Sequence, residues 1–529
     1  MDNNKKQIWL PLFFAIVMIF GMLVGYNLHK HTTSSNFFSS GKTNSIQEVV
    51  SLIQNKYVDK IKIDSISEAT INDLLSHLDP HSIYIPQNDV QAINDDLIGN
   101  FYGIGVEFQM FEDTVTVISV VKNGPSEKAG VQAGDKIIFV NDTTKIAGVK
   151  ITTDVIRNLL RGEENSKVNI TVIRDQKQQK ITITRGSIPV STIDASYMIE
   201  PQTGFIRLNK FGEKTYEEFM EQLEKLQKEG MKNLILDLRG NTGGLLNEAV
   251  DIADEFLSNN KLVVYTEGAK SARYEFKCKR DGLFEEGKLI ILVDETSASA
   301  SEVLAGALQD WDRATIIGRR TFGKGLVQQQ FSLSNGGALR LTVSRYYTPL
   351  GRNIQKSYTN KSKEEYRRDA LGIEPHEKYE NEDSAHPKPS FKTPSGKTVF
   401  GGGGILPDIL VTTDSITLTN NIAKIYHTNF LNKVALKLYI QNKNYLSKIN
   451  SADKFYAEKL PTENDLSLVE KIAKSDSISL QKFSEKEKET LLFSIKKLIA
   501  KQMFGNNGYY QLANKTDKVV LKAMEQVKQ

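Results

Sequence analysis

The stretch KLIILVDETSASASEVLAGALQDW, residues 288–311, joins a short apolar run to a helical pattern through a segment of serine and alanine. KLIILVD is almost continuously apolar, as expected of a buried strand, and VLAGALQDW resumes at helical spacing. The same order occurs in NLILDLRGNTGGLLNEAVDIADEFL, residues 233–257. The repeated strand, turn and helix predict an α/β core over residues 204 to about 350.

Four hydroxyl side chains lie close together in TSASASE, residues 296–302. Ser299 followed by Glu302 fits a helix capping box, and the alanines would allow close packing at the start of a helix. A serine nucleophile is the alternative, but it needs a base to take its proton. The histidines lie outside the α/β core, at positions 29, 31, 77, 81, 376, 386 and 427. The sequence does not exclude a Ser–His–Asp triad, but it offers no natural candidate for one.

A lysine can replace histidine as the base if burial keeps it neutral, because burial lowers a lysine pKa from about 10.4 by several units. TFGKG, residues 321–325, offers Lys324 between two glycines and near Phe322. Taken alone, Lys324 reads more naturally as a solvated surface lysine.

The turn in LDLRGNTGGL, residues 236–245, is rich in glycine and lies between a strand and a helix. No G-K-[ST] follows it, which argues against a phosphate-binding P-loop. Exposed N–H groups at the start of a helix could instead stabilise an oxyanion. A tight turn that binds nothing is the plain alternative.

Residues 98–190 read as a β-rich module. In FYGIGVEF, residues 101–108, the glycines would let N–H groups converge on a carboxylate, and the strand edge could pair with an extended peptide. A simple turn is the alternative. GPSEKAGVQAGDKIIFVN, residues 124–141, follows, and the two segments together resemble a PDZ domain. The matching positions are Pro125, Ala129, Gly130, Gly134, Asp135 and Asn141.

The resemblance implies two parts of a peptide groove in this module. The carboxylate-binding loop would consist of Gly103, Ile104, Gly105 and Val106. The helix that lines the groove would carry Ile156 and Leu160.

The N-terminus predicts a membrane anchor. The run from Ile8 to Tyr26 is uncharged, and at about 1.5 Å per residue it spans most of a hydrocarbon core of roughly 30 Å. Lys5 and Lys6 precede it and favour a cytoplasmic N-terminus, whereas Lys30 weakens that bias. A cleaved signal peptide is the alternative, but the run is long and no good cleavage site follows it.

Composition narrows the classes of function. Hydrophobic residues make up 40% of the chain and charged residues 25%, as in ordinary folded proteins. The net charge of +4 is spread over 529 residues without a basic block, which argues against nucleic-acid binding. Cys278 is the single cysteine, so an internal disulfide and a cysteine-cluster metal site are excluded.

Taken in order, these segments resemble the C-terminal processing peptidases, also called tail-specific proteases. The ordered match covers roughly residues 45–412 and includes the PDZ-like module, GFIRLNKF (204–211), DLRGNTGG, SASASEVLAGALQD, TFGKGLVQ and GGILPD. The family consists of membrane-associated or exported serine endopeptidases with a Ser–Lys dyad. Thr242 stands where many members have proline, and the charged stretch at 355–397 and the helical tail also depart from the family.

The resemblance assigns roles to residues of the core. It makes Ser299 the nucleophile, Lys324 the general base and Gln328 the residue that orients the lysine. The oxyanion donors would be the amides of Ala300 and of either Gly243 or Gly244. Ser299 cannot use its hydroxyl fully as a helix cap and also face Lys324, so a complete capping box would contradict the assignment.

The expected fold class is α/β, with a ClpP- and crotonase-like protease core of ββα units, a β-rich PDZ domain, helical segments at both ends and one N-terminal transmembrane helix. The expected parts are an anchor at 1–30, a tether at 31–44, a helical segment at 45–97, the PDZ domain at 98–190, the protease core at 191–412 with a polar surface insert at about 355–397, and a helical region at 413–529.

The expected function is hydrolysis of exported proteins whose free, apolar C-termini bind the PDZ domain, without a metal or cofactor. Residues 8–26 would contact the lipid bilayer of a bacterial inner membrane, with the catalytic part facing the periplasm, and the helical termini could mediate self-association or adaptor binding. Two alternatives remain: a catalytically inactive PDZ scaffold, and a crotonase-type acyl-CoA enzyme, against which the PDZ module and an exported location argue.

Overall fold

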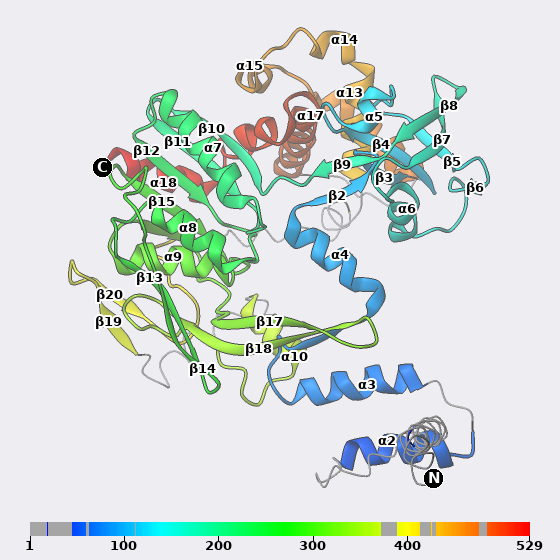
Figure 1. The fold of residues 1–529 in the computed structure, drawn as a ribbon. Helices are drawn as coiled ribbons and strands as arrows, with labels where there is room; N and C mark the ends of the chain where they lie inside the picture. The colour runs from blue at the N-terminus through cyan, green and yellow to red at the C-terminus, as the bar shows by residue number, and fades with distance from the viewer. Residues whose placement is uncertain are drawn as a thin grey trace, which may run out of the picture. The chain divides into compact units, whose positions relative to one another are not determined.

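The computed structural model describes Met18 and residues 45–59, 63–111, 113–371, 389–412, 425, 430–475 and 484–529. The chain divides into two compact units, Met1–Thr70 and Ile71–Gln529. Helix α2 (Ser45–Lys56) belongs to the first unit, and α3 (Ile63–Ser76) begins there (Figure 1). Both helices agree with the apolar spacing of the sequence in this region.

The expected transmembrane helix over residues 8–26 lies outside the described residues, apart from Met18. Where the structure does describe the chain, no helix combines the length and apolar character that crossing a bilayer requires. The membrane anchor therefore stays a prediction.

The PDZ-like module consists of a β-sheet, a separate pair of strands and two helices. Its sheet has the order β3-β4-β5-β7-β8, with β6 paired to β5, and a separate pair joins β2 to β9. The strands are β2 (Asn100–Gly103), β3 (Val106–Phe111), β4 (Thr114–Val120), β5 (Lys136–Val140), β6 (Thr144–Lys145), β7 (Lys167–Arg174), β8 (Lys177–Thr184) and β9 (Gly186–Pro189), and the helices are α5 (Pro125–Lys128) and α6 (Thr153–Leu160). Alternating apolar side chains from these strands form one continuous core with Ile156 of α6.

The α/β core is built on a six-stranded sheet of order β10-β11-β12-β15-β16-β21, in which every pair from β11 onward is parallel. Its strands are β10 (Ile193–Glu200), β11 (Thr203–Leu208), β12 (Asn233–Asp237), β15 (Leu289–Val293), β16 (Thr315–Gly318) and β21 (Ile409–Leu410). Helices α7 (Thr215–Lys228), α8 (Leu246–Asp254) and α9 (Ala300–Asp310) pack against one face. The buried apolar runs at 233–238 and 288–294 thus form the two central strands, as predicted.

A second sheet lies beside this core, and its strand β17 (Leu326–Ser332) carries Gln328 and begins shortly after Lys324. The sheet pairs β1 (Ile83–Ile85), β18 (Ala338–Tyr347), β13 (Leu262–Gly268) and β14 (Ser271–Lys277) in that order, and β17 also pairs with β18. The predicted hairpin between β17 and β18 is confirmed. Strand β1 brings a segment from before the PDZ-like module into this sheet, which local sequence patterns did not reveal.

The polar stretch at 355–397 was expected to be a surface loop or a flexible excursion, and this is wrong for Lys363–Ala370 and Ser390–Lys392, which form a helix and a strand. Helix α10 (Lys363–Ala370) starts with a capping box of Ser362 and Glu365. Its Tyr366 is buried, which anchors the helix despite its charged composition. Strands β19 (Ser390–Lys392) and β20 (Thr398–Phe400) form a hairpin farther along. Residues 372–388 lie outside the described residues.

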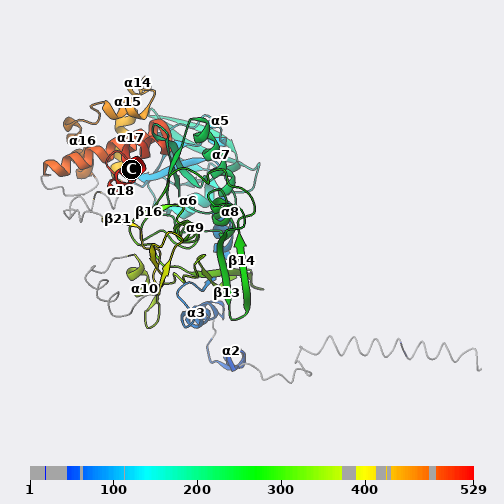
Figure 2. The ribbon, with the colours of Figure 1, turned by 90° about the vertical axis from the view of Figure 1, so that its left-hand side faces the viewer.

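The C-terminal region is helical, as predicted. It contains α13 (Phe430–Gln441), α14 (Lys443–Leu446), α15 (Ala452–Ala457), the 3₁₀ turn η1 (Glu463–Asp465), α16 (Leu466–Ser475), α17 (Glu485–Ala513) and α18 (Lys518–Lys528). The expected capping box of Ser484 and Glu487 begins α17. Helix α18 lies beside β15 and β16 of the core sheet, and Figure 2 shows it near β16 and β21.

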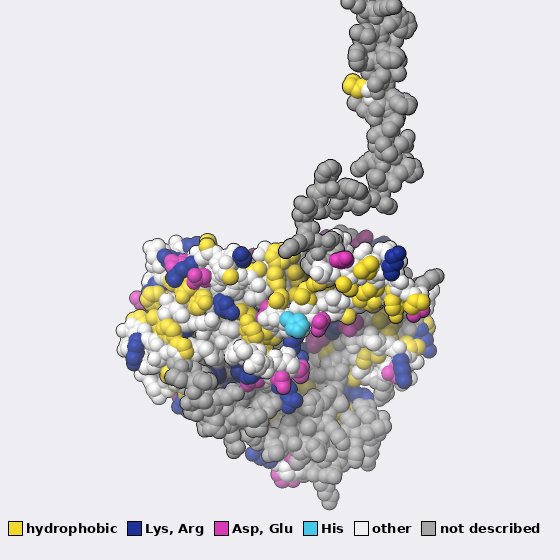
Figure 3. All heavy atoms as spheres, turned by 90° about the horizontal axis from the view of Figure 1, so that it is seen from below, with side chains coloured by type: hydrophobic (Ala, Val, Ile, Leu, Met, Phe, Trp, Pro, Cys, Tyr) yellow, Lys and Arg dark blue, Asp and Glu magenta, His cyan; other side chains and the backbone are white. Residues whose placement is uncertain are grey.

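The surface carries mixed charge. On the face that Figure 3 shows, Lys and Arg side chains alternate with Asp and Glu, and hydrophobic side chains lie between them. Among the described residues of this face, no large area carries charge of one sign.

Candidate active site

A cleft of about 570 Å³ opens at the carboxyl ends of the parallel core strands. In open α/β sheets this edge is the usual position of a binding site, because the loops that follow the strands converge there. The residues predicted to take part in catalysis all line the cleft: Gly243, Gly244, Ser299, Ala300, Lys324 and Gln328.

The four hydroxyls of TSASASE are not equivalent in the structure. Three of them donate hydrogen bonds that hold the turn together. These bonds run from Thr296 Oγ1 to Asp294 Oδ1 (2.6 Å), from Ser297 Oγ to the Leu238 carbonyl oxygen (2.8 Å) and from Ser301 Oγ to the Asn241 carbonyl oxygen (3.0 Å). Ser299 Oγ donates to no acceptor in the described part of the chain, and Ser299 is the one of the four that lines the cleft.

Ser299 occupies a strained backbone position between β15 and α9. Its φ of 54° and ψ of −114° lie in a region that residues other than glycine rarely adopt. Such a conformation costs on the order of 1–3 kcal/mol and persists only where the surrounding structure enforces it. The sharp corner places Ser299 at the cleft, at the start of α9.

The expected conflict between capping and nucleophile does not arise. The Glu302 carboxylate accepts from the Ser299 N–H at 2.9 Å, which is one half of a capping box. The Glu302 N–H donates to the Ser299 carbonyl oxygen at 2.8 Å. Ser299 Oγ lies near this N–H in a capping-box arrangement, but no side-chain capping hydrogen bond forms. The hydroxyl therefore remains available for chemistry.

Lys324 lies in the loop between β16 and β17. Its Nζ donates to Gln328 Oε1 at 2.9 Å, and Gln328 Nε2 in turn donates to the carbonyl oxygen of His81. No hydrogen bond joins Ser299 Oγ to Lys324 Nζ within the described residues, although both line the same cleft. In structures without substrate, catalytic hydrogen bonds are often long and tighten only when substrate binds.

The surroundings of Lys324 favour its neutral form. Burial lowers the pKa of Lys324 from its usual 10.5, and Arg340 lowers it further, while Glu302 and Asp79 act in the opposite direction. A lower pKa increases the fraction of amine that can accept a proton at neutral pH. The structure thus supplies the condition under which a lysine can serve as a base.

His81 lies on the same side of the site but does not act as a partner of the serine. Its ring packs against Phe322 and Tyr366, and its Nε2 lies 3.3 Å from the Tyr366 hydroxyl. Burial, followed by the positive charge of Lys324, lowers the pKa of His81 to about 4. His81 is therefore a neutral packing residue whose main chain holds Gln328.

Glu302, which the sequence indicated only as a capping residue, joins the two halves of the site. Its carboxylate is completely buried and accepts four hydrogen bonds. The donors are Ser299 N (2.9 Å), Thr321 Oγ1 (2.6 Å), Gly323 N (2.8 Å) and Lys324 N (2.9 Å). One carboxylate thus fixes the main chain on both sides of the cleft.

Tyr346 of β18 holds the same two residues as Glu302, but as a hydrogen-bond donor to their carbonyl oxygens. Its hydroxyl contacts the carbonyl oxygens of Ser299, at 3.1 Å, and of Lys324. The amides of both residues therefore bond Glu302 and their carbonyls meet Tyr346. Nothing in the sequence around Tyr346 indicates this role, because the contact depends on the pairing of distant strands.

The glycine turn approaches Ser299 very closely. A Cβ on Gly243, whose φ is 98°, would lie 2.7 Å from both the Ala298 carbonyl oxygen and Ser299 Cβ, so a side chain does not fit. The Gly243 N–H donates to Asn241 Oδ1 at 2.8 Å. The Gly244 N–H donates to no acceptor among the described residues, and the N–H of Ala300, the first residue of α9, has no partner within the helix.

The predicted peptide groove lies in the PDZ-like module, away from this cleft. The loop from Gly103 to Val106 connects β2 to β3, and β3 is the edge strand of its sheet. Ile104, Ile156 and Leu160 are buried in the core of the module, and α6 exposes Val155 (47%) instead. The edge strand fits peptide addition, while the roles of the individual groove residues stay predictions.

Within the ranges that the structure describes, no group of three or more His, Cys, Asp or Glu side chains is arranged to hold a metal ion.

Comparison with known proteins places these features in a family. Residues 202–378 match the model of peptidase family S41, and residues 103–184 match a PDZ domain model. A probable CtpA-like serine protease of Staphylococcus aureus is 36% identical over 364 residues, which cover 66% of this chain and 72% of that protein. A probable CtpA-like serine protease of Staphylococcus haemolyticus is 35% identical over 312 residues, covering 58% and 62%.

Among solved structures, the photosystem II D1 C-terminal processing protease is similar, with 26% identity, coverage of 72% of this chain and 88% of that chain, and a TM-score of 0.36. The chain therefore belongs to peptidase family S41 and is a C-terminal processing serine protease with a PDZ domain.

Proposed function

We propose that this protein is a membrane-anchored serine endopeptidase that hydrolyses peptide bonds with Ser299 as nucleophile and Lys324 as general base. The observation that carries the proposal is the meeting of three features in one cleft. They are a buried lysine with a lowered pKa, a serine hydroxyl that donates to no group among the described residues, and two amides without an acceptor in that part of the chain. A scaffold without catalysis would not need this combination, and family membership removes the acyl-CoA alternative.

The chemistry proceeds through an acyl-enzyme. Neutral Lys324 takes the proton of Ser299 Oγ, which attacks the scissile carbonyl carbon, and the lysine then gives the proton to the leaving amine. Gln328 orients the lysine through the bond to Nζ. Water, deprotonated by Lys324, next attacks the acyl carbon. The bond from that carbon to Ser299 Oγ breaks, the acid product leaves, and Lys324 returns the proton to Ser299 Oγ.

The oxyanion of each tetrahedral intermediate needs donors that are free before the reaction. Ala300 supplies one amide, and we assign the second to Gly244, because the Gly243 amide already bonds Asn241. Preorganised donors of this kind contribute about 2.7–4 kcal/mol each in serine peptidases.

The nucleophile can be identified chemically in the full-length chain held in detergent micelles. A fluorophosphonate ester should modify Ser299, and peptide mass mapping should locate the phosphonyl group there. An unstructured polypeptide with an apolar C-terminus should be cleaved at internal bonds and should protect Ser299 from modification. Modification of another serine, with Ser299 untouched, would contradict the assignment.

Recognition of free C-termini is proposed for the PDZ domain, because β3 is an edge strand next to the glycine loop at 103–106. Amidation of the substrate's C-terminus removes the carboxylate charge and is expected to raise KM about tenfold with little change in kcat, since tethering raises the effective substrate concentration. Steady-state kinetics with the free and amidated forms measure this. A short peptide that contains the cleavage site but no tail is the control, and equal KM values for both long forms would exclude the role.

The location of the enzyme is proposed from the uncharged run at 8–26. That run would hold the chain in a bacterial inner membrane, with the catalytic part in the periplasm acting on exported proteins. Added protease should degrade the catalytic part in spheroplasts and leave it intact in whole cells. Protection in spheroplasts would place it on the cytoplasmic side.

A further inference from the structure

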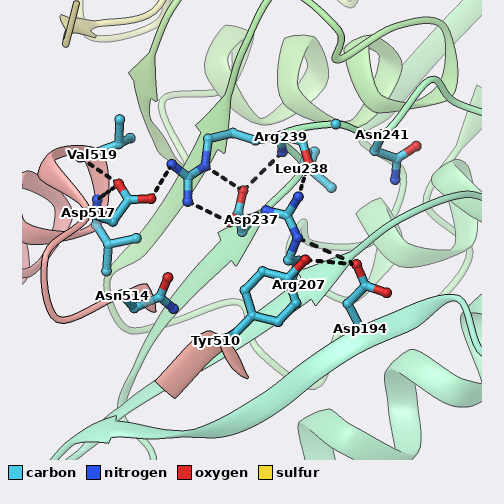
Figure 4. Close-up of polar contacts among 12 residues, drawn as sticks. Asp194, Arg207, Asp237, Leu238, Arg239, Asn241, Tyr510, Asn514, Asp517 and Val519 are labelled. Atoms are coloured by element: carbon cyan, nitrogen blue, oxygen red, sulfur yellow. Dashed lines mark hydrogen bonds and ion pairs between the residues drawn. The ribbon is translucent and has the colours of Figure 1, made fainter. Parts of the chain in front are cut away.

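An ion-pair network links the C-terminal helical region to the segment that precedes the glycine turn (Figure 4). Asp237, at the end of β12, is completely buried and bonds Arg207 Nη1 at 2.6 Å. Arg239 binds the same carboxylate with two nitrogens, at 2.9 and 2.8 Å. Arg239 Nη1 then reaches Asp517 Oδ2 at 2.8 Å. Arg239 thus connects Asp237 to the residue before α18, and Arg207 binds Asp237 from the neighbouring strand β11.

The arginines keep Asp237 ionised despite its burial. Although burial favours the neutral acid, Arg239 and Arg207 hold the pKa of Asp237 below its usual value. Arg207 also lies over the ring of Tyr510 of α17, at 4.9 Å from the ring centroid. Asp517 is therefore not a lone surface contact but the outer member of a buried charge cluster.

Helix α18 is itself part of the core. It covers the face of the six-stranded sheet opposite α7, α8 and α9. The apolar contacts join Val519, Val520 and Ala523 to Phe205, Ile235, Ile290, Leu292 and Ile317. Asp517 is the N-cap of this helix and accepts from Val519 N and Val520 N through Oδ1, which leaves Oδ2 for Arg239.

The network reaches the active site through the main chain of Arg239. The Arg239 N–H donates to Asp237 Oδ1 at 3.0 Å, and its carbonyl oxygen accepts from Arg207 Nη2 at 2.7 Å. The next residue, Gly240, donates its N–H to Asp294 Oδ1 at 3.1 Å. Both peptide groups at the start of the glycine turn are thus held by charged side chains.

Asn241 continues the connection to the nucleophile. Its carbonyl oxygen accepts from Ala298 N and Ser301 Oγ, both at 3.0 Å, on either side of Ser299. Its side chain bonds the Leu208 carbonyl oxygen and the Gly243 N–H. A shift of the turn at Arg239 would therefore move the glycine amides relative to Ser299.

We propose that Asp517 is a positioning residue, and that α18 serves catalysis by holding Arg239 and, through it, the glycine turn that supplies an oxyanion donor. This inference rests on the proposed function, since it assigns the turn a role in the reaction. The helical tail, which the sequence left without a role, thereby becomes part of the catalytic apparatus.

The two jobs of Asp517 can be separated by substitution. Serine and asparagine cap helices about as well as aspartate, so Asp517→Ser and Asp517→Asn retain the cap of α18 and remove the charge that binds Arg239. Lys528→Ala is the matched control. It removes the ion pair of Lys528 with Glu200 at the other end of the same helix, at 3.0 Å, without touching the network.

Three measurements on the full-length protein test the role. Asp517→Ser is expected to lower kcat roughly tenfold with KM unchanged, because small displacements of catalytic groups cost that much or more. A substrate-like peptide aldehyde forms a tetrahedral adduct with Ser299 Oγ, and its Ki should rise by about the same factor. The corresponding peptide alcohol cannot form the adduct, so its affinity should not change. Lys528→Ala should match the wild type in all three.

The outcomes separate this inference from the proposed function. Ser299→Ala is measured alongside: if it remains active, the proposed function fails and the inference fails with it. If Ser299→Ala is inactive while Asp517→Ser and Asp517→Asn keep the kcat of Lys528→Ala, the inference alone is overturned. A loss of kcat with unchanged aldehyde affinity would also overturn it. Thermal unfolding of each variant confirms that the kinetic temperature lies well below its Tm.

Discussion

Replacement of Lys324 by methionine is expected to lower kcat at least about 10³-fold, because a general base contributes about 10²–10⁴-fold. Methionine keeps the length and apolar character of the side chain and removes the amine. Ser299→Ala removes the nucleophile, and the loss should reach on the order of 10⁴–10⁶-fold. Hydrolysis of an unstructured substrate with an apolar C-terminus measures both.

Stability should move in the opposite direction for Lys324→Met. The pKa of Lys324 is lower in the folded than in the unfolded chain, so unfolding takes up a proton at pH values between the folded pKa and 10.5. The buried lysine therefore disfavours the folded state below pH 10.5. This penalty is lost as pH rises from the folded pKa to 10.5, the usual pKa. Methionine removes the penalty, and Tm at pH 7 should rise while activity disappears.

The pH dependence of the wild type provides a second check. Its kcat/KM should increase with pH as Lys324 loses its proton, with the midpoint below 10.5. Lys497→Met is a suitable control, because burial also lowers the pKa of Lys497 but this lysine lies on α17 outside the cleft. Equal loss of activity in the Lys497 variant, or retained activity in Lys324→Met, would contradict the dyad.

Glu302→Gln is expected to lower kcat about 10²-fold at pH 8, because the residue holds both halves of the site in register and small misplacements are costly. Glutamine has the same shape, but its amide nitrogen would face N–H donors that now bond a carboxylate oxygen. Loss of the negative charge also lowers the pKa of Lys324, since Glu302 raises it. A more protonated base therefore cannot explain the expected loss.

The effect of this substitution should depend on pH in a specific way. Burial raises the pKa of Glu302 to about 7, so below that pH the wild type itself carries a protonated side chain with fewer acceptors. The ratio of wild-type to variant kcat should accordingly shrink as pH falls through 7. Asp254→Asn is the matched control, because Asp254 is also buried and accepts from a main-chain N–H, that of Lys279, away from the cleft. A ratio independent of pH would exclude Glu302 as the group that titrates.

The sequence predicted the central strands, because the short apolar runs at 233–238 and 288–294 are bounded by turns and are typical of buried strands. It also predicted that Ser299, Lys324 and Gln328 lie together, because the family motifs contain these three residues, and all three line the cleft. Local chemistry could not choose among four hydroxyls. The structure separates them by their hydrogen bonds, of which Ser299 Oγ donates none within the described residues.

The remaining features depend on which helix and sheet faces pack together. The spacing of apolar residues along the sequence does not specify this packing. The spacing of apolar residues predicts α18 as a helix, but not that it covers the core sheet. The same limit applies to Tyr346 and to His81, whose contacts arise from the pairing of β1, β17 and β18. Charged composition likewise concealed α10, where one buried aromatic side chain fixes the helix.

The backbone of Ser299 has a consequence for how this fold can lose its activity. A φ of 54° with a ψ of −114° suits glycine better than serine, so the nucleophile occupies the one place in its turn where its own side chain opposes folding. If proteolysis were no longer required, glycine could replace Ser299, because glycine adopts these backbone angles without steric strain. A relative with glycine at this position would lack the hydroxyl that we propose as the nucleophile, and its backbone would be free of this strain.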